Sequence, residues 1–314
     1  MARLVVVVAT YNRLPLLRRC LDSIAAHTAS EHEVVVVDGG STDGTREWLR
    51  GRSDVTAVLQ DELLGVARAY NAVWRGLDCT YTSWLSDDVE LASDGLDTAI
   101  RELDADAGLG MVGLKMRDTT GPAWKPFGGA LSVHGVINMN HGVVRFDLLR
   151  EVGFFHEGYR SYMVDPDLTA AILSTGSAVA ITKSVVLLHH RQEPVQREER
   201  ASLDSDDHPA KVLYRERFRY LEQEPSRGDR AARALLRLAL RGLMARAPVD
   251  GTRLGFDRRD QWLLPAARFV SPLDPLRTAG RAIHYVQRVP GPLLRRPGNP
   301  YRELAARERA SAAR

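Results

Sequence analysis

Two short segments of the chain bring carboxylates together in patterns that could do chemistry. Asp87 and Asp88 are adjacent and follow an apolar, strand-like stretch, while Asp165 and Asp167 stand one residue apart. Adjacent carboxylates are costly unless a cation or hydrogen bonds neutralise them, so the first pair is a candidate cation site. The second pair stands at the start of a predicted helix. An acidic turn before a helix at Gly95 and a simple helix cap are the respective structural alternatives.

A further carboxylate, Asp38, follows a run of valines that predicts a buried strand. In open α/β sheets, ligands bind at the carboxyl ends of the strands, and Asp38 stands at such an end. The first strand ends in residues 9–13, Ala-Thr-Tyr-Asn-Arg, which contain no glycine. A dinucleotide-binding turn needs glycines at this place, so a dinucleotide-dependent enzyme is disfavoured. Helix capping by Asp38 and Ser41 remains the alternative to ligand binding.

The elements that must position these carboxylates alternate between strand and helix. Residues 4–9 and 34–37 are unbroken apolar runs dominated by valine, which is typical of strands buried on both faces of a parallel sheet. Apolar residues recur at helical spacing over 14–24, after an Asn12 cap and with Pro15 in the first turn. Right-handed crossovers would wind such units into one doubly wound sheet. Further strands are predicted near 55–59, 82–85, 111–114, 142–146 and 184–188. A second helix is predicted to contain Trp48 and Leu49, after Ser41 and Thr42, and further helices near 66–77, 95–103, 147–152 and from 165 onward.

Composition divides the chain into two regions. Residues 201–314 contain 23 Lys and Arg against 13 Asp and Glu, whereas residues 1–200 contain 20 against 27. The acidic balance suits a front region that takes a cation, and the basic balance suits anionic partners, although it could also be a solvated surface. We therefore predict a catalytic domain over 1–200 and an Arg-rich, mainly helical C-terminal extension over 201–314.

The C-terminal region offers two contact hypotheses. Residues 193–210 are predicted to be a linker or lid, and residues 231–246 an amphipathic Arg/Leu helix that could dock on an anionic membrane or form a homodimer interface. The arginines of this region lack the motifs of a nucleic-acid protein, so no nucleic-acid partner is expected.

Cys20 and Cys79 have no disulfide or zinc spacing, and the apolar run at 4–9 is too short for a signal sequence or a membrane span. A cytoplasmic protein, with the inner membrane face as an alternative peripheral location, is expected.

The two predicted strand ends together resemble a known family. Residues 7–13, followed by residues 37–43, are similar to the signature of family 2 glycosyltransferases of the GT-A fold. This resemblance implies an α/β fold with a Rossmann-like, mostly parallel mixed sheet flanked by helices. It also implies inverting transfer of a sugar from a nucleoside diphosphate, with UDP or dTDP preferred, to a hydroxyl group. Five matching motifs occur in the expected order between residues 5 and 192.

The resemblance implies nucleotide contacts at the first strand ends and on the helix after residue 64. Leu64 stands where the family usually has asparagine, just before a matching glycine. The implied nucleotide-binding residues are Thr10, Tyr11, Arg13, Asp38, Gly65, Arg68, Asn71 and Asp87.

Metal and base positions are implied by the two carboxylate segments. Residues 86–88 resemble the family's DxD site, which holds Mg²⁺ or Mn²⁺ through one or two carboxylates and the substrate phosphates. Ser86 takes the first carboxylate position, so Asp88 is the implied ligand, and His189 matches a further metal or diphosphate contact. Asp165 matches the family's general base, with Val164 in place of the usual Glu.

The implied contacts to the donor sugar and the acceptor are Trp124, His141, Gly142, Asp167 and His190. The acceptor class stays open between a glycan, a lipid-linked sugar and a small natural product. A nucleotidyltransferase is an alternative in the same fold, but the Gly-rich loop that such enzymes carry after the first strand is absent from the sequence. A relative that binds a nucleotide sugar or glycan without turnover is the second alternative, because Ser86 and Val164 depart from the family pattern.

Overall fold

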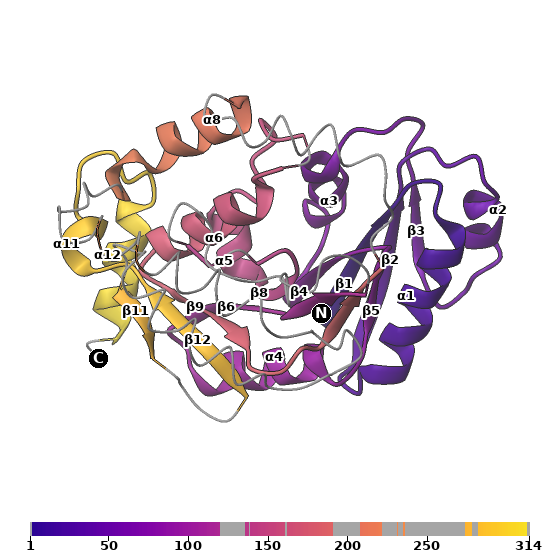
Figure 1. Cartoon of the computed structure of the whole chain (residues 1–314), viewed down its shortest axis with the longest axis horizontal. Helices are drawn as coiled ribbons and strands as arrows, with labels where there is room; N and C mark the ends of the chain where they lie inside the picture. Colours follow the sequence, from indigo (N-terminus) through magenta and orange to yellow (C-terminus); the bar gives the residue numbers. More distant parts are fainter. Residues whose placement is uncertain are drawn as a thin grey trace.

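The structure is a computed structural model of the chain, shown in Figure 1. It describes residues 2–119, 136–137, 139–160, 162–190, 208–221, 274–277 and 282–312, together with positions 231 and 235. Trp124 lies outside the described residues, as do most of the predicted 119–129 loop, the predicted 193–210 linker and the predicted 231–246 helix. The membrane and dimer hypotheses for that helix therefore stay predictions.

Strands and helices alternate over the first 190 residues. The strands of this part are β1 (Ala2–Thr10), β2 (His32–Asp38), β3 (Thr56–Leu59), β4 (Cys79–Ser86), β5 (Val89–Leu91), β6 (Leu109–Gly113), β7 (Met116–Asp118), β8 (Gly142–Arg145), β9 (Ala178–Thr182) and β10 (Leu187–His189). The helices are α1 (Leu14–His27), α2 (Thr45–Arg50), α3 (Val66–Trp74), α4 (Gly95–Ala105), α5 (Phe146–Glu151) and α6 (Val164–Ser174).

One sheet of nine described strands forms the centre of the molecule, and two of them, β11 (Asp274–Arg277) and β12 (Ile283–Arg288), come from the C-terminal region. The strand order is β11-β12-β9-β6-β8-β4-β1-β2-β3. Strand β1 pairs in parallel with β2 and with β4, so that Thr10 lies opposite Asp38 and Ala9 lies opposite Ser86. Strand β8 is antiparallel to both β4 and β6. Because the parallel strands β1, β2 and β4 end at the same edge, the chemically interesting segments that follow them meet there. Strands β5, β10 and β7 form a second, small sheet.

Two apolar layers cover the sheet, one on each face, and alternate residues of β1 point into one layer or the other. Val5 and Val7 pack in the cluster that contains α3, α5 and α6, whereas Val6 and Val8 pack in the cluster that contains α1 and α4. Alternate side chains of a strand point to opposite faces, so a strand that is apolar throughout must be covered on both sides. Figure 1 shows these helices on the two sides of the sheet. The predicted α/β fold with a mixed sheet flanked by helices is confirmed.

The described part of the C-terminal region contains helices together with two strands that join the central sheet. Its described elements are α8 (Pro209–Phe218), the 3-10 turn η1 (Arg219–Leu221), β11 (Asp274–Arg277), β12 (Ile283–Arg288), α11 (Gly291–Leu294) and α12 (Arg302–Ala312). Strand β12 pairs antiparallel with β9 and so extends the central sheet. Leu293, Leu294 and Ala305 are buried in the same cluster as α6. The described C-terminal elements therefore pack against the same core as α6, and the predicted division near residue 200 stays a prediction. No helix among the described residues combines the length and apolarity needed to cross a membrane.

Candidate active site

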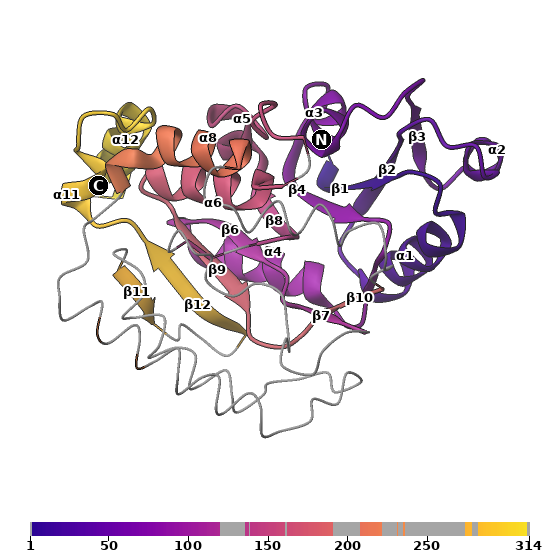
Figure 2. The same ribbon diagram turned by 45° about the horizontal axis from the view of Figure 1, so that its top comes forward.

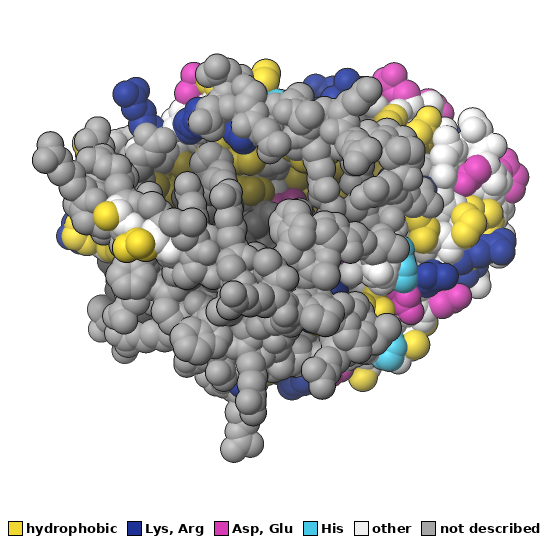
Figure 3. Space-filling model, in the orientation of Figure 1, with side chains coloured by type: hydrophobic (Ala, Val, Ile, Leu, Met, Phe, Trp, Pro, Cys, Tyr) yellow, Lys and Arg dark blue, Asp and Glu magenta, His cyan; other side chains and the backbone are white. Residues whose placement is uncertain are grey.

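A cavity of about 520 Å³ opens at the edge of the sheet where β1, β2 and β4 end. Figure 3 shows a hollow near the middle of one face, with an acidic side chain among apolar ones. Seven segments contribute to the cavity wall: residues 9–13, 37–39, 60–70, 84–88, 116, 140–141 and 164–165, joined by His189. The cavity therefore collects several of the predicted motifs from distant parts of the chain.

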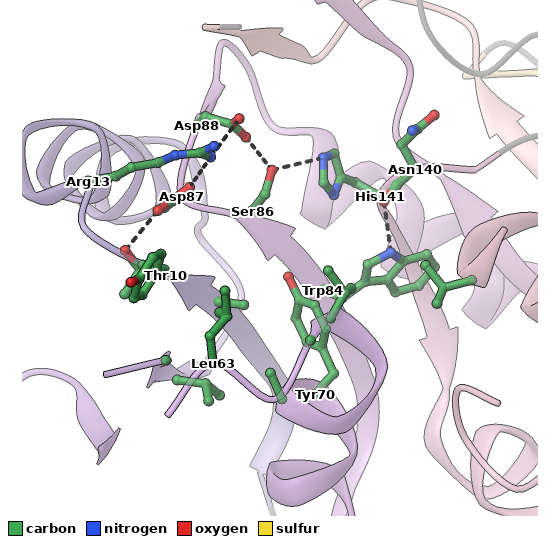
Figure 4. A pocket seen from close by; sticks show the side chains of 18 of the residues that line it. Thr10, Arg13, Leu63, Tyr70, Trp84, Ser86, Asp87, Asp88, Asn140 and His141 are labelled. Atoms are coloured by element: carbon green, nitrogen blue, oxygen red, sulfur yellow. Dashed lines mark hydrogen bonds and ion pairs between the residues drawn. The ribbon is translucent and has the colours of Figure 1, made fainter. Parts of the chain in front are cut away.

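The two adjacent carboxylates lie at one end of this cavity and share one arginine. Nη1 of Arg13 lies 3.1 Å from a carboxylate oxygen of Asp87 and 3.1 Å from one of Asp88, as Figure 4 shows. The Thr10 hydroxyl donates to Asp87 at 2.8 Å, and the Ser86 hydroxyl donates to Asp88. Hydrogen bonds and the Arg13 guanidinium thus balance the negative charges of the two adjacent carboxylates.

The two carboxylates differ in acidity because their surroundings differ. Burial raises the pKa of Asp87 from 3.8 to about 6, with Arg13 opposing the rise. Burial also raises the pKa of Asp88, but hydrogen bonds from His189 and Ser86 and the charge of Arg13 outweigh it and hold that pKa well below its usual range. Asp88 is therefore the firmly ionised member of the pair, as expected of a cation ligand.

His189 stands between two carboxylates on neighbouring strands. Its Nδ1 lies 2.7 Å from Asp118 Oδ1, and its Nε2 lies 3.4 Å from Asp88 Oδ2. Burial lowers the pKa of His189, but the two carboxylates raise it to about 9 overall. The sequence analysis missed Asp118. Parallel pairing of β10 with β7 places Asp118 directly opposite His189. In the sequence, Asp118 is marked only as a carboxylate that ends a short segment.

The donor set of Asp88 and His189 fits a divalent cation once His189 has lost a ring proton, because an imidazole binds a metal in its neutral form. A carboxylate oxygen and an imidazole nitrogen face the same cavity, and both are ligand types that Mn²⁺ accepts. Among the described residues no group of three or more His, Cys, Asp or Glu side chains is arranged to hold a metal ion. A cation at this place would therefore need further ligands from a substrate, such as phosphate oxygens.

Asp165 lies elsewhere on the cavity wall, in the first turn of α6. The preceding Met163 adopts a left-handed backbone with φ of 71°, a conformation that nonglycine residues rarely take and that turns the chain sharply into the helix. Burial raises the pKa of Asp165 from 3.8 to about 8, and the Trp84 indole lowers it only in part. That indole N–H donates to the Asn140 carbonyl at 2.8 Å (Figure 4). A carboxyl with such a pKa can exchange a proton near neutral pH.

The predicted nucleotide residues separate into two groups. Thr10, Tyr11, Arg13, Gly65 and Asp87 line the cavity. Gly65 has a φ of 89°, and a Cβ there would stand 2.8 Å from the Arg160 carbonyl oxygen, so glycine is required.

The other three predicted nucleotide residues do not line the cavity. Asp38 is fully buried and accepts hydrogen bonds from the backbone of Gly40 and Ser41. Arg68 is largely exposed and lies 3.6 Å from Glu157. Asn71 is buried and exchanges two hydrogen bonds with the Phe155 backbone, because it joins α3 to the segment after α5.

Of the predicted sugar-site residues that the structure describes, only His141 lines the cavity. Its Nδ1 has no hydrogen-bond partner among the described residues, and burial lowers the pKa of His141 to about 4, so the ring is neutral. Gly142 is packed against the Val112 carbonyl and Trp84, since a Cβ there would stand 2.8 Å from the former. His190 contacts Glu90 at 2.7 Å instead.

Asp167 points away from the cavity and pairs with Arg217. Cavity residues that the sequence analysis missed include Gln60, Leu63, Tyr70 and Met116. Most are apolar or neutral, so no charge or spacing signal could distinguish them from core residues.

Comparison with known proteins agrees with this geometry. The family model for glycosyl transferase family 2 matches residues 5–165, which is more than half of the chain. Glycosyltransferase GlyA of Streptococcus pneumoniae is 30% identical over 104 residues, which are 32% of this chain and 15% of that protein. A PGL/p-HBAD biosynthesis glycosyltransferase of Mycobacterium tuberculosis is 36% identical over 84 residues, which are 26% of this chain and 32% of that protein. The match therefore spans less than a third of either relative's length.

Solved structures support the fold over a longer stretch. A mannosyltransferase from Pyrobaculum calidifontis, solved in complex with GDP-Man and Mn²⁺, superposes with a TM-score of 0.50 at 19% identity, covering 99% of this chain and 75% of the other. Residues 1–349 of TarS from S. aureus superpose with a TM-score of 0.51 at 16% identity, covering 86% of this chain and 81% of the other. At these identities the likeness speaks for the fold. Together with the family match, it shows that the chain belongs to glycosyl transferase family 2 and has the GT-A fold.

Proposed function

We propose that the chain is an inverting glycosyltransferase that moves a sugar from a nucleoside diphosphate to an acceptor hydroxyl. In a single displacement, the acceptor oxygen forms a bond to the anomeric carbon while the bond from that carbon to the diphosphate oxygen breaks. The proton of the acceptor hydroxyl passes to the carboxylate of Asp165, and the bonding pair leaves with the nucleoside diphosphate. The acceptor is a glycan, a lipid-linked sugar or a small natural product.

One observation carries this proposal: Asp88, His189 and Asp165 line the same cavity although they come from the turn after β4, from β10 and from α6. Asp88 is held ionised, and Asp165 has a pKa of about 8 because of burial. Two carboxyls with such different acidities suit two different roles, a permanent charge at the leaving group and a proton acceptor at the attacking oxygen.

Asp88 and His189 are the residues that would hold Mg²⁺ or Mn²⁺. Such a cation, when bound, neutralises the charge that develops on the departing diphosphate. Arg13 supports the same end of the cavity, because its guanidinium already lies between Asp87 and Asp88 and can turn one face toward phosphate oxygens.

We place the nucleoside against the part of the cavity wall formed by Tyr11, Leu63 and Gln60, where Tyr11 and Leu63 are exposed side chains. A flat base stacks well on an aromatic ring. The Gln60 side-chain oxygen has no hydrogen-bond partner, so a base N–H can satisfy it after a small amide rotation. Uracil, thymine and guanine all carry such an N–H, and we keep UDP or dTDP as the preferred carriers.

The test is calorimetric titration with UDP, dTDP, GDP and CMP, each with and without Mn²⁺ or Mg²⁺. We expect one diphosphate to bind in a metal-dependent manner to the wild-type protein and to Asp165→Asn, but not to Asp88→Ala. Transfer from the matching nucleotide sugar is expected for wild type and lost in Asp165→Asn. Tight binding without any transfer would favour the noncatalytic alternative, and absence of any nucleotide binding would refute the proposal.

A further inference from the structure

Helix α6, which carries Asp165, is buried on nearly all sides. Ten of its eleven residues are buried, and Asp165 is the exception. A helix that is apolar all round must be covered on every face. The sheet covers one side through β9, and residues of α8 and α12 pack in the same apolar cluster as α6. Figures 1 and 2 show α8 next to α6.

An ion pair joins the N-terminal end of α6 to α8. Asp167 accepts hydrogen bonds from Arg217 Nε at 2.7 Å and from Arg217 Nη2 at 3.2 Å, and from the Tyr159 hydroxyl at 2.8 Å. The Arg217 guanidinium also donates to the Tyr301 hydroxyl at 3.2 Å. Asp167 is only 2% exposed, so its charge depends on these partners. Because two guanidinium nitrogens each donate to one carboxylate oxygen, the pair also fixes the orientation of the first turn of α6.

The C-terminal end of α6 is held by the same region of the chain. The Ser174 carbonyl accepts a hydrogen bond from Asn299 Nδ2 at 3.1 Å, and the Ser174 hydroxyl bonds to the Tyr220 hydroxyl. Arg296 in turn donates to the Tyr220 carbonyl at 2.9 Å. Both ends of α6 are therefore anchored by residues beyond the family match, which stops at residue 165.

Helix geometry links this anchor to the cavity. Two residues of an α-helix are separated by about 200° around its axis, so Asp165 and Asp167 lie on nearly opposite sides of the first turn. Accordingly, Asp165 lines the cavity while Asp167 meets α8. A rotation of the first turn that frees Asp167 from Arg217 would also turn Asp165 away from its place on the cavity wall.

We propose that Asp167 and Arg217 are positioning residues: their ion pair sets the orientation of α6 and so aims Asp165 at the acceptor hydroxyl. The inference rests on the proposed function, since it takes Asp165 as the base. It assigns to the C-terminal region a part in catalysis that does not require contact with any substrate.

The experiment compares Arg217→Ala and Arg217→Lys with wild type and with the control Arg219→Ala. Arg219 is exposed and begins the turn that follows α8, so its variant removes the same charge from the same region. Hydrogen exchange of the α6 amides reports anchoring of the helix, calorimetry reports nucleotide diphosphate binding with Mn²⁺, and steady-state kinetics report kcat and the donor KM.

For Arg217→Ala we expect faster exchange in the first turns of α6 and a kcat lowered by roughly 10-fold to 100-fold, as a misplaced catalytic group produces, with diphosphate affinity within about twofold of wild type. Arg217→Lys keeps the positive charge but not the paired hydrogen bonds, so its kcat should lie between those of wild type and Arg217→Ala. Arg219→Ala should match wild type in all three measurements.

Several results would overturn the inference. Unchanged exchange in Arg217→Ala would show that the ion pair does not anchor α6, and lost diphosphate binding would show a general structural role. Faster exchange with unchanged kcat would show that anchoring does not aim the base. Should Arg217→Ala fail to fold, Arg217→Lys decides by the same three measurements. Absence of transfer by the wild-type protein itself would instead refute the proposed function.

Discussion

The raised pKa of Asp165 predicts that this residue lowers the free energy of unfolding at neutral pH, although the proposed reaction needs it. Its pKa is raised from 3.8 to about 8 by burial, so the folded state holds the proton more tightly than the unfolded state. Stability is then highest below pH 4 and falls by about 1.4 kcal/mol per pH unit until the pH reaches the folded pKa. At pH 7 the ionisable carboxyl costs roughly 4 kcal/mol relative to a neutral side chain of the same shape.

Asp165→Asn is the perturbation that removes this cost. The variant should be more stable than wild type by roughly 4 kcal/mol at pH 7, and the difference should shrink to roughly 2 kcal/mol at pH 5 and become constant above pH 8. Urea denaturation of both proteins between pH 5 and pH 9 measures it. Because only the difference between the two proteins is used, the titration of other groups cancels. Asp78→Asn, at an exposed position, serves as the control and should follow wild type.

The same pKa predicts the pH dependence of turnover. At pH 7 only about a tenth of Asp165 would be ionised, so kcat should rise about tenfold between pH 7 and pH 9 and then level off. Parallel stability curves for wild type and Asp165→Asn would refute the reasoning, because they would mean that burial does not shift this carboxyl. A flat rate profile together with diverging stability curves would mean that Asp165 is buried but is not the base.

Further predictions concern the cation end and the sheet. Asp88→Ala should weaken Mn²⁺-dependent nucleotide diphosphate binding about tenfold or more, measured by calorimetry. Ser86→Asp adds a carboxylate where the Ser86 hydroxyl now donates to Asp88, so the melting temperature should fall in EDTA and rise more than that of wild type on adding Mn²⁺. Gly142→Ala should destabilise by about 1–3 kcal/mol in urea denaturation, because a Cβ would stand 2.8 Å from the Val112 carbonyl. The control Gly76→Ala meets nothing closer than 3.7 Å, and a loss above about 0.5 kcal/mol there would contradict the steric argument.

The first half of the fold was predictable because its signals are local. Runs of valine define β1 and β2, and leucines at helical spacing define α1. The sequence analysis missed β9, although all five of its residues are buried, since Ala178 to Thr182 is a short apolar run that periodicity cannot distinguish from a helix segment. It also missed β12, which lies in a region rich in arginine and proline and becomes a strand by pairing with β9.

The candidate site was predictable where a motif carries charge and not where a contact depends on tertiary structure. Asp88, Asp165 and His189 were chosen from sequence, and the structure brings all three to one cavity. Asp118 was missed because only the parallel pairing of two short strands places it beside His189. Asp167 was expected near the sugar, whereas its partner proves to be Arg217, 50 residues further along the chain. Such pairings leave no local pattern, so only the fold reveals them.

The energetic cost of the base and the presence of the C-terminal cover are connected. Keeping Asp165 in a site that raises its pKa to about 8 works against the burial of α6 at neutral pH, by roughly 4 kcal/mol. Breaking a buried ion pair such as that of Asp167 and Arg217 costs about 3–5 kcal/mol, which is of the same size and acts on the same turn of the helix. Without Arg217, the first turn of α6 would therefore carry a second carboxylate that lacks a partner, in addition to Asp165. In this chain a segment that lies outside the family match keeps the base in place.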